Sequence, residues 1–214
     1  MFALNQENSI ANHYLAEIRD VSIQQDRARF RRNIRRLGTL LAYEMSKSLN
    51  YKAQGVETPL ARTTVNVVQD QLVLIPILRA AVPFYEGFLE LFDQADCGFI
   101  GAWRTHGEQN EIDTELNYQA APNLDGKTVV VIDPMLATGK SLVKTVKSLS
   151  QQGQPNAWHL ASAIAAPEGI EYVQNELGKD VKLWTCAVDE KLNEKSYIVP
   201  GLGDAGDLAF GPKL

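Results

Sequence analysis

The clearest prediction of the fold comes from residues 128–141, which read TVVVIDPMLATGKS. The first five residues form a continuous run, rich in β-branched side chains, that is typical of a strand buried on both faces of a parallel sheet. The run ends at Asp133, and small residues precede a helix predicted over residues 140–152. One face of that helix carries Leu142, Val143, Val146 and Leu149. This spacing indicates an amphipathic helix, so the segment predicts a buried strand, a short turn and a helix.

The segments on both sides continue this alternation. Further strands are predicted at residues 64–68, 72–78, 99–103, 159–166 and 181–188, and further helices at residues 26–49, 83–92 and 168–177. From residue 72 onward the alternation predicts an α/β fold, in which a mostly parallel central sheet is flanked by helices. Ligands bind such sheets at the carboxyl ends of the strands. The corresponding residues here are 79–80, 103–105, 133–141, 167–169 and 189–204.

The whole chain, residues 1–214, is predicted to be a single domain with three less regular parts. Residues 1–60 are expected to form an N-terminal helical segment, in which residues 26–49 carry the strongest apolar face. Residues 104–122 are polar and without a clear period, which predicts a flexible arm or a hairpin. Residues 199–214 are rich in Gly and Asp and are predicted to be a loop, at the end of a tail formed by residues 189–214.

The composition narrows the class of protein. The formal net charge of -5 over 214 residues argues against a general nucleic-acid binder, which usually carries a basic surface. Cys97 and Cys186 are too few for a disulfide framework or a zinc site, and are expected to be buried thiols. The first ten residues, MFALNQENSI, do not resemble a signal peptide. No apolar run approaches the roughly 18–20 residues of a membrane helix, so a cytoplasmic enzyme is expected.

The turn at residues 133–141 has the chemistry of a phosphate site. A helix start presents unpaired backbone N–H groups and partial positive charge, both of which favour a bound anion. Thr138 and Ser141 add hydroxyl donors, and Asp133 can accept hydrogen bonds from sugar hydroxyls. A nucleotide P-loop would need a glycine at position 134, where Pro134 has no N–H group to donate. An ordinary strand-to-helix turn is the other interpretation of this segment taken alone.

Residues 129–141, VVVIDPMLATGKS, resemble the phosphoribosyl diphosphate loop of the phosphoribosyltransferases, in the form seen in the uracil phosphoribosyltransferase family. Other segments resemble the same family in the same order: RRLGTLLAYE at 35–44, IPILRA at 75–80, AAPEGI at 165–170, LNEKSYIVPGLGDAGD at 192–207 and FG at 210–211. The resemblance therefore spans nearly the whole chain. It implies a type I phosphoribosyltransferase fold, with a protruding arm at residues 104–122 and a C-terminal base-binding hood.

The resemblance also implies the residues that bind 5-phospho-α-D-ribose 1-diphosphate (PRPP). They are Arg79, Arg104, Asp133, Pro134, Met135, Leu136, Ala137, Thr138, Gly139, Lys140, Ser141 and Asp204. Among them, Arg79, Arg104 and Asp204 are the implied catalytic residues. The two guanidinium groups can hold the departing diphosphate, and Asp204 is implied to orient the attacking nitrogen. Magnesium is the implied cofactor, bound with PRPP through few direct protein ligands and without a separate metal site. Lys140 and Ala81 each stand where relatives usually have Gly.

Uracil is implied to bind at Ile198, Gly203, Asp204 and Ala205, where backbone N–H and C=O groups can match its carbonyl and N3–H pattern. The implied reaction converts uracil and PRPP to UMP and diphosphate, in pyrimidine salvage. A homodimer or larger homo-oligomer is implied, and the apolar face of helix 26–49 is one candidate surface for it. The arginines at 27–36 raise the question of a GTP effector. The alternatives are transfer to another base and an RNA-binding regulator with the same fold.

Overall fold

The computed structural model describes residues 1–106 and 112–212, except for the side chains of 102–106 and 112–116. A nine-stranded sheet forms the centre of the described chain, with the main order β1-β11-β10-β8-β4-β6-β7. The strands are β1 (Phe2–Ala3), β4 (Leu72–Leu78), β5 (Asp96–Cys97), β6 (Phe99–His106), β7 (Ile112–Ala120), β8 (Thr128–Ile132), β9 (Met135–Leu136), β10 (Ala157–Ala165) and β11 (Lys182–Val188). All pairs in this sheet are parallel except β6 with β7. The predicted mostly parallel α/β sheet is confirmed.

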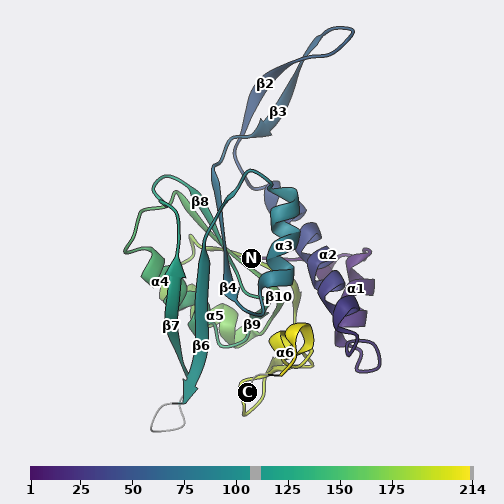
Figure 1. Cartoon of the computed structure of the whole chain (residues 1–214), viewed down its shortest axis with the longest axis vertical. Helices are drawn as coiled ribbons and strands as arrows, with labels where there is room; N and C mark the ends of the chain where they lie inside the picture. The colour runs from purple at the N-terminus through teal and green to yellow at the C-terminus, as the bar shows by residue number, and fades with distance from the viewer. Residues whose placement is uncertain (107–111, 213–214) are drawn as a thin grey trace.

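Helices cover both faces of this sheet (Figure 1). They are α1 (Ala11–Arg19), α2 (Arg27–Ser46), α3 (Val82–Leu91), α4 (Lys140–Leu149), α5 (Pro167–Leu177) and α6 (Ala205–Phe210), with a short 3-10 helix at Leu4–Gln6. Apolar residues of α1, α2, α3 and α6 share one core cluster, whereas those of α4 and α5 belong to a second. The two clusters lie on opposite faces of the sheet.

The central strands supply side chains to both clusters in alternation. In β8, Val130 and Ile132 join the core under α2, while Val129 and Val131 join the core under α4. Successive residues of a strand point to opposite faces, so a strand buried on both sides must be apolar throughout. This explains why residues 72–78 and 128–132 were predictable to the residue: their bounds match β4 and β8.

Helix α2 follows its prediction closely at its beginning. The Asp26 side chain accepts hydrogen bonds from the backbone N–H groups of Ala28 and Arg29 at 3.0 Å, which is a standard helix N-cap. The predicted apolar face, however, does not face a partner molecule. Phe30, Ile34, Leu37, Leu41 and Met45 are each at most 2% exposed inside the protein's own core. The expectation that this face serves oligomer assembly is therefore wrong.

A two-stranded hairpin projects from the body of the protein (Figure 1). It consists of β2 (Tyr51–Glu57) and β3 (Arg62–Val68), paired antiparallel from Tyr51 with Val68 to Glu57 with Arg62. Only β3 was predicted, and β2 lies in the segment expected to be helical. Tyr51, Leu60 and Val65 are exposed on this hairpin, Leu60 to 96%.

Two other regions refine the predictions. Residues 104–122 were expected to be an arm or a hairpin, and β6 and β7 form an antiparallel hairpin at this place. Residues 107–111, between the two strands, lie outside the described residues. The prediction that residues 199–214 form a loop is wrong in part, because Ala205–Phe210 forms α6. Within the described residues, no helix is both long and apolar enough to span a membrane.

Candidate active site

A cavity of about 810 Å³ lies at the carboxyl ends of β4 and β8. Its walls come from the end of β4, the segment that joins β8 to α4, and the C-terminal segment around α6. The lining residues are Ile77, Leu78, Arg79, Ala80, Gly101, Asp133, Met135, Leu136, Ala137, Thr138, Gly139, Lys140, Ser141, Leu142, Ser196, Tyr197, Ile198, Gly203, Asp204, Ala205, Gly206 and Pro212. The cavity therefore lies where the parallel sheet predicts a ligand site.

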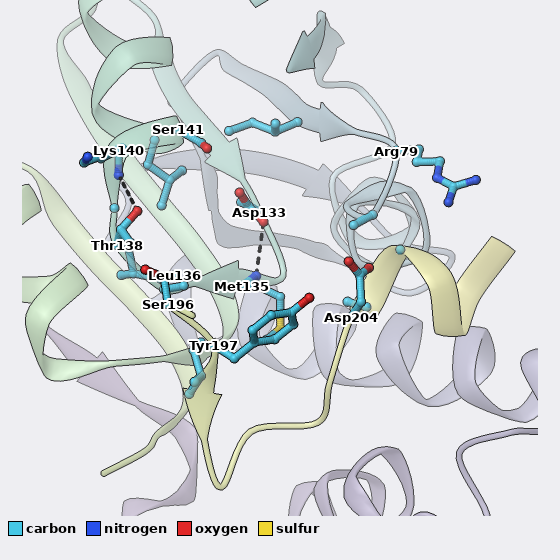
Figure 2. A pocket seen from close by; sticks show the side chains of 18 of the residues that line it. Arg79, Asp133, Met135, Leu136, Thr138, Lys140, Ser141, Ser196, Tyr197 and Asp204 are labelled. Carbon is cyan, nitrogen blue, oxygen red and sulfur yellow. Dashed lines mark hydrogen bonds between the residues drawn. The ribbon is translucent and has the colours of Figure 1, made fainter. Parts of the chain in front are cut away.

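The phosphate-loop candidate forms one wall of this cavity, and Figure 2 shows Asp133, Thr138 and Ser141 around it. Helix α4 begins at Lys140, directly after Gly139, whose φ of 77° is left-handed and suits glycine,. The N–H groups of the first helical turn have no acceptor within the helix and carry partial positive charge. The Asp133 carboxylate accepts a hydrogen bond from the N–H of Met135 at 3.1 Å. The loop thus offers an anion site next to a fixed carboxylate.

Arg79 follows β4 and is directed away from Asp133 in Figure 2. One terminal nitrogen, Nη2, donates to the carbonyl oxygen of Gly211 at 2.7 Å and contacts the Asp207 carboxylate at 3.1 Å. The Arg79 Nε atom is buried and has no hydrogen-bond partner. In this structure the guanidinium group therefore binds the C-terminal segment, while its side chain still lines the cavity.

The C-terminal segment forms the opposite wall. The antiparallel pair β12 (Lys191–Leu192) and β13 (Ile198–Val199) leads into a Gly-rich turn and then α6. The Asp204 carboxylate caps α6 by accepting a hydrogen bond from the Asp207 N–H at 3.0 Å. Ile198 and Ala205 are buried, at 5% and 3% exposure, at the edge of the cavity. Residues of this turn and of the phosphate-loop candidate therefore line the same cavity.

Most of the predicted site residues line this one cavity. Pro134 does not: it is buried, and its carbonyl oxygen accepts hydrogen bonds from Ala163 and Ile164 of β10 at 3.0 Å. Arg104 lies in β6, opposite Thr114 of β7, and its side chain lies outside the described residues. The segments 167–169 and 189–195 do not contribute to the lining.

Several lining residues were not assigned a role from the sequence. Ser196 and Tyr197 stand in the segment 192–207 that carries the family resemblance, so that segment was the available signal. Figure 2 shows the Tyr197 ring between the phosphate-loop candidate and Asp204. Gly206 and Ala80 also line the cavity. Ala80 lies in the segment 79–80 that was expected at the ligand-binding edge of the sheet, although it was given no individual role,.

Ala81 and Lys140, which stand where relatives usually have Gly, both occupy positions that a residue with a side chain can adopt without backbone strain. Ala81 is fully buried and has a right-handed φ of -71°, so the backbone there does not require glycine. Lys140 is exposed at the first residue of α4, and Figure 2 shows its side chain directed away from Asp133. Its charge lies at the end of the helix that is already positive.

Most arginines on the exposed face of α2 have partners within the chain. Arg29 and Arg35 form ion pairs with Glu17 and Glu90, at 2.5 and 3.1 Å. Arg31 donates to the carbonyl oxygen of Ala209 at 2.7 Å. Hydrogen bonds from Arg29 and Asn33 hold the pKa of the Glu17 carboxyl at about 2. These contacts give the face a structural role in joining α1, α3 and α6 to α2.

The fold and the cavity together define a class of enzyme. A mostly parallel sheet with a helix start suited to an anion, a carboxylate at the strand end and a Gly-rich wall is the arrangement expected of a phosphoribosyltransferase. A solved hypoxanthine phosphoribosyltransferase from Staphylococcus aureus shares the fold, with a TM-score of 0.53 and 15% identity over 86% of this chain and 83% of that one.

The chain belongs to the uracil phosphoribosyltransferase family, because the model of that family matches residues 5–212. A uracil phosphoribosyltransferase of Porphyromonas gingivalis is 44% identical over 211 residues, which cover 99% of this chain and 98% of the relative. A solved protein of Aquifex aeolicus has a TM-score of 0.86 and 34% identity, covering 96% of both chains.

Proposed function

We propose that this protein catalyses the transfer of a 5-phosphoribosyl group from PRPP to uracil, which yields UMP and diphosphate for pyrimidine salvage. The observation that supports it is one cavity whose two walls match the two substrates. The start of α4 suits a phosphate, and the turn before α6 presents backbone groups to a flat, polar base. Membership of the uracil phosphoribosyltransferase family gives the reaction and the base.

The 5′-phosphate of PRPP would bind at residues 137–141, where backbone N–H groups and the hydroxyls of Thr138 and Ser141 can donate. The Asp133 carboxylate would accept hydrogen bonds from the ribose hydroxyls. Arg79 and Arg104 would hold the diphosphate, since a guanidinium group pairs with phosphate oxygens in a fixed planar geometry. As the bond to diphosphate breaks, the anomeric carbon gains positive charge and the leaving group gains negative charge. Catalysis would then rest on position and on charge stabilisation, without a protein nucleophile.

Arg79 must change partners for this role. Its guanidinium group binds Asp207 and the Gly211 carbonyl oxygen, and the Asp207 pair is about 40% exposed on both sides. Exposed ion pairs contribute only about 0–1 kcal/mol. A charged diphosphate can therefore compete with the Asp207 carboxylate for the Arg79 guanidinium group.

Uracil would bind in the turn formed by Ile198 and residues 203–205. Backbone N–H and C=O groups there would pair with the carbonyls and N3–H of uracil, and would meet the reversed donor and acceptor of cytosine unfavourably. Asp204 would lie between base and ribose, where its carboxylate can orient the attacking nitrogen.

Magnesium would enter with PRPP. Within the described residues there is no group of three or more His, Cys, Asp or Glu side chains that could hold a metal ion. Asp133 and Asp204 line the cavity, and Asp133 would contact a cation carried by the sugar if it binds the ribose hydroxyls. Bound magnesium would supply positive charge to the leaving diphosphate.

A panel of bases tests this function directly. The enzyme is incubated with PRPP, magnesium and either uracil, cytosine, hypoxanthine or orotate, and the nucleotide formed is measured. UMP should form from uracil and little or no nucleotide from the others. Orotate is a useful comparison because its carboxylate needs a cation that the 198–205 turn does not contain. Absence of UMP at every uracil concentration would contradict the proposal.

We also propose that the protein forms a homodimer or larger homo-oligomer through the hairpin of β2 and β3. Tyr51, Leu60 and Val65 expose apolar surface on a hairpin that projects from the body (Figure 1). The core-facing side of α2 is buried and unavailable for this purpose.

Regulation by GTP and a cytoplasmic location also remain proposals. The arginine face of α2 is largely engaged within the chain, so GTP would have to displace these contacts; an unchanged rate with GTP present would remove the idea. The cytoplasm is favoured because Cys97 and Cys186 are both free thiols, which suits a reducing compartment.

A further inference from the structure

An ion pair outside the cavity, with a buried carboxylate and a partly exposed arginine, binds the turn that is proposed to hold uracil. Asp189 follows β11, and its side chain is only 4% exposed. Arg19, the last residue of α1, binds both carboxylate oxygens of Asp189, with distances of 2.6 and 2.9 Å. The two residues are 170 positions apart in the chain, and neither lines the cavity.

The same pair binds both backbone groups of Gly201. The Gly201 N–H donates to Asp189 Oδ2 at 2.8 Å, and Arg19 Nη1 donates to the Gly201 carbonyl oxygen at 3.0 Å. The three residues therefore form a closed ring of hydrogen bonds, two of which fix the orientation of one peptide segment. Gly201 itself is buried, has a φ of 60°, and would place a Cβ 2.2 Å from the Ile198 carbonyl oxygen.

Gly201 lies between the two parts of the proposed uracil site. Ile198 precedes it by three residues, and Gly203 follows it by two, so a rotation of the Gly201 peptide would move both. Backbone recognition of a base requires donors and acceptors to be held within a fraction of an ångström. The turn is also attached at its start, where β13 pairs with β12 and the Glu190 N–H donates to the Val199 carbonyl oxygen at 3.0 Å. Arg19 and Asp189 add the side-chain hydrogen bonds to the middle of the turn, at Gly201.

We infer that Arg19 and Asp189 are positioning residues for uracil: they act through Gly201 to set the geometry of the base-binding turn without touching the substrate. This inference rests on the proposed placement of uracil at Ile198 and residues 203–205. It assigns a function in base recognition to the N-terminal helix α1, which lies outside the cavity. The ring also predicts that the two substrates respond differently, because its hydrogen bonds join Arg19, Asp189 and Gly201 and fix the uracil turn directly.

The test is steady-state kinetics of Arg19→Ala with each substrate varied in turn. The KM for uracil should rise by between about tenfold and a hundredfold, the range expected when a site is displaced by about 1 Å. The KM for PRPP should change by less than about twofold. Guanidinium ion added at millimolar concentration should restore part of the affinity for uracil, because it can occupy the space of the missing side chain and bridge Asp189 to Gly201. A purely structural role would not produce rescue that is selective for one substrate.

Two further variants keep the test valid if Arg19→Ala folds poorly. Arg19→Lys retains the charge but has no fork that can reach Asp189 and Gly201 together, so its KM for uracil should be intermediate. Asp189→Asn retains an acceptor for the Gly201 N–H and should also raise the KM for uracil. The matched control is Arg29→Ala, which likewise removes an arginine that binds one carboxylate through two bonds, here Glu17 at 2.5 and 2.9 Å, away from the turn. This control should leave both KM values unchanged.

A variant inside the turn tests the placement of uracil separately from the positioning role of Arg19 and Asp189. Ala205→Val adds volume to a buried residue of the cavity wall and should raise the KM for uracil if the base binds there. If Ala205→Val has this effect while Arg19→Ala and Asp189→Asn leave the KM for uracil within about twofold of the wild-type value, the positioning role is wrong and the uracil site stands. If all three leave it unchanged, the placement of uracil is wrong and the inference falls with it. Equal rises in both KM values for Arg19→Ala would also overturn the inference.

Discussion

Asp204 has a structural role and a proposed chemical role, and the two can be separated. Its carboxylate caps α6 through the Asp207 N–H at 3.0 Å, and its side chain also lines the cavity. Asparagine caps helices about as well as aspartate, whereas alanine loses about 1 kcal/mol of stability at such a position. The charge, by contrast, is lost in both substitutions.

We predict that Asp204→Asn keeps the melting temperature of the wild type and lowers kcat/KM for UMP formation by about tenfold or more, equivalent to about 1.4 kcal/mol of transition-state stabilisation. Asp204→Ala should lower activity at least as much and also reduce stability. Thermal unfolding and initial rates measure the two effects independently. Near-normal turnover by either variant would contradict the placement of the base and sugar at Asp204.

The contact between β4 and α6 is the feature that matters at the scale of secondary-structure elements. Arg79, after β4, binds Asp207 in the first turn of α6. If diphosphate takes the place of Asp207, the two compete for one guanidinium group. The contact then acts against PRPP binding by no more than the strength of a half-exposed ion pair.

We predict that Asp207→Asn lowers the Kd for PRPP by at most about fivefold, because such a pair contributes about 0.2–1 kcal/mol. Isothermal titration calorimetry without uracil measures this effect. Glu90→Gln is the matched control, since Glu90 pairs with Arg35 on an exposed surface away from the cavity. Weaker PRPP binding by Asp207→Asn would show that the contact prepares Arg79 for the diphosphate instead of competing with it.

At the scale of the whole molecule, the hairpin of β2 and β3 is the main part that packing in the protein's core does not account for. It contributes no buried residue to either core cluster. We predict that replacing residues 52–67 by a short Gly-Ser turn leaves the far-ultraviolet circular dichroism of the body nearly unchanged and shifts the protein from oligomer to monomer. Size-exclusion chromatography with light scattering measures the mass. An unchanged oligomer would place the interface elsewhere, and a monomeric wild-type protein would remove the assembly proposal.

His159 makes the stability of the whole molecule dependent on pH. It lies in β10 and is 1% exposed; Trp184 of β11 stacks on it and donates Nε1–H to its Nδ1 at 3.2 Å. Burial, with Lys182 nearby, lowers its pKa to about 4. In the unfolded chain the pKa of histidine is about 6.5, so the unfolded state binds the proton first as pH falls. The contribution of neutral His159 is therefore fully present above about pH 6.5 and is lost progressively toward pH 4.

We predict that the free energy of unfolding decreases by up to about 3 kcal/mol from this group between pH 6.5 and pH 4, from a pKa difference of about 2.5 units. Urea denaturation at a series of pH values measures it. His159→Gln should show a smaller decrease over that range, whereas His13→Gln, at an exposed position of α1, should behave as the wild type. Equal pH dependence of His159→Gln and the wild type would contradict the prediction.

The sequence by itself determined the central strands, most of the helices and the position of the phosphate-loop candidate. β4 and β8 are buried on both faces, so their apolar runs are local signals, and α2 has a period and a cap that can be read from neighbouring residues. The cavity follows, because parallel strands end together. The uracil segment was found by family resemblance, and its backbone chemistry could not be read from periodicity.

Only the tertiary structure decided the features that join distant residues. β2 shows no alternation because neither face of the hairpin is buried, and α6 is too short and rich in small residues to show a period. Three features depend on elements that are far apart in the chain. They are the hydrogen bonds of Pro134 to β10, the Arg79 contact with Gly211, and the ring of Arg19, Asp189 and Gly201. Hydrogen-bond partners separated by many residues leave no periodic trace, since their proximity results from packing of the whole sheet and its helices.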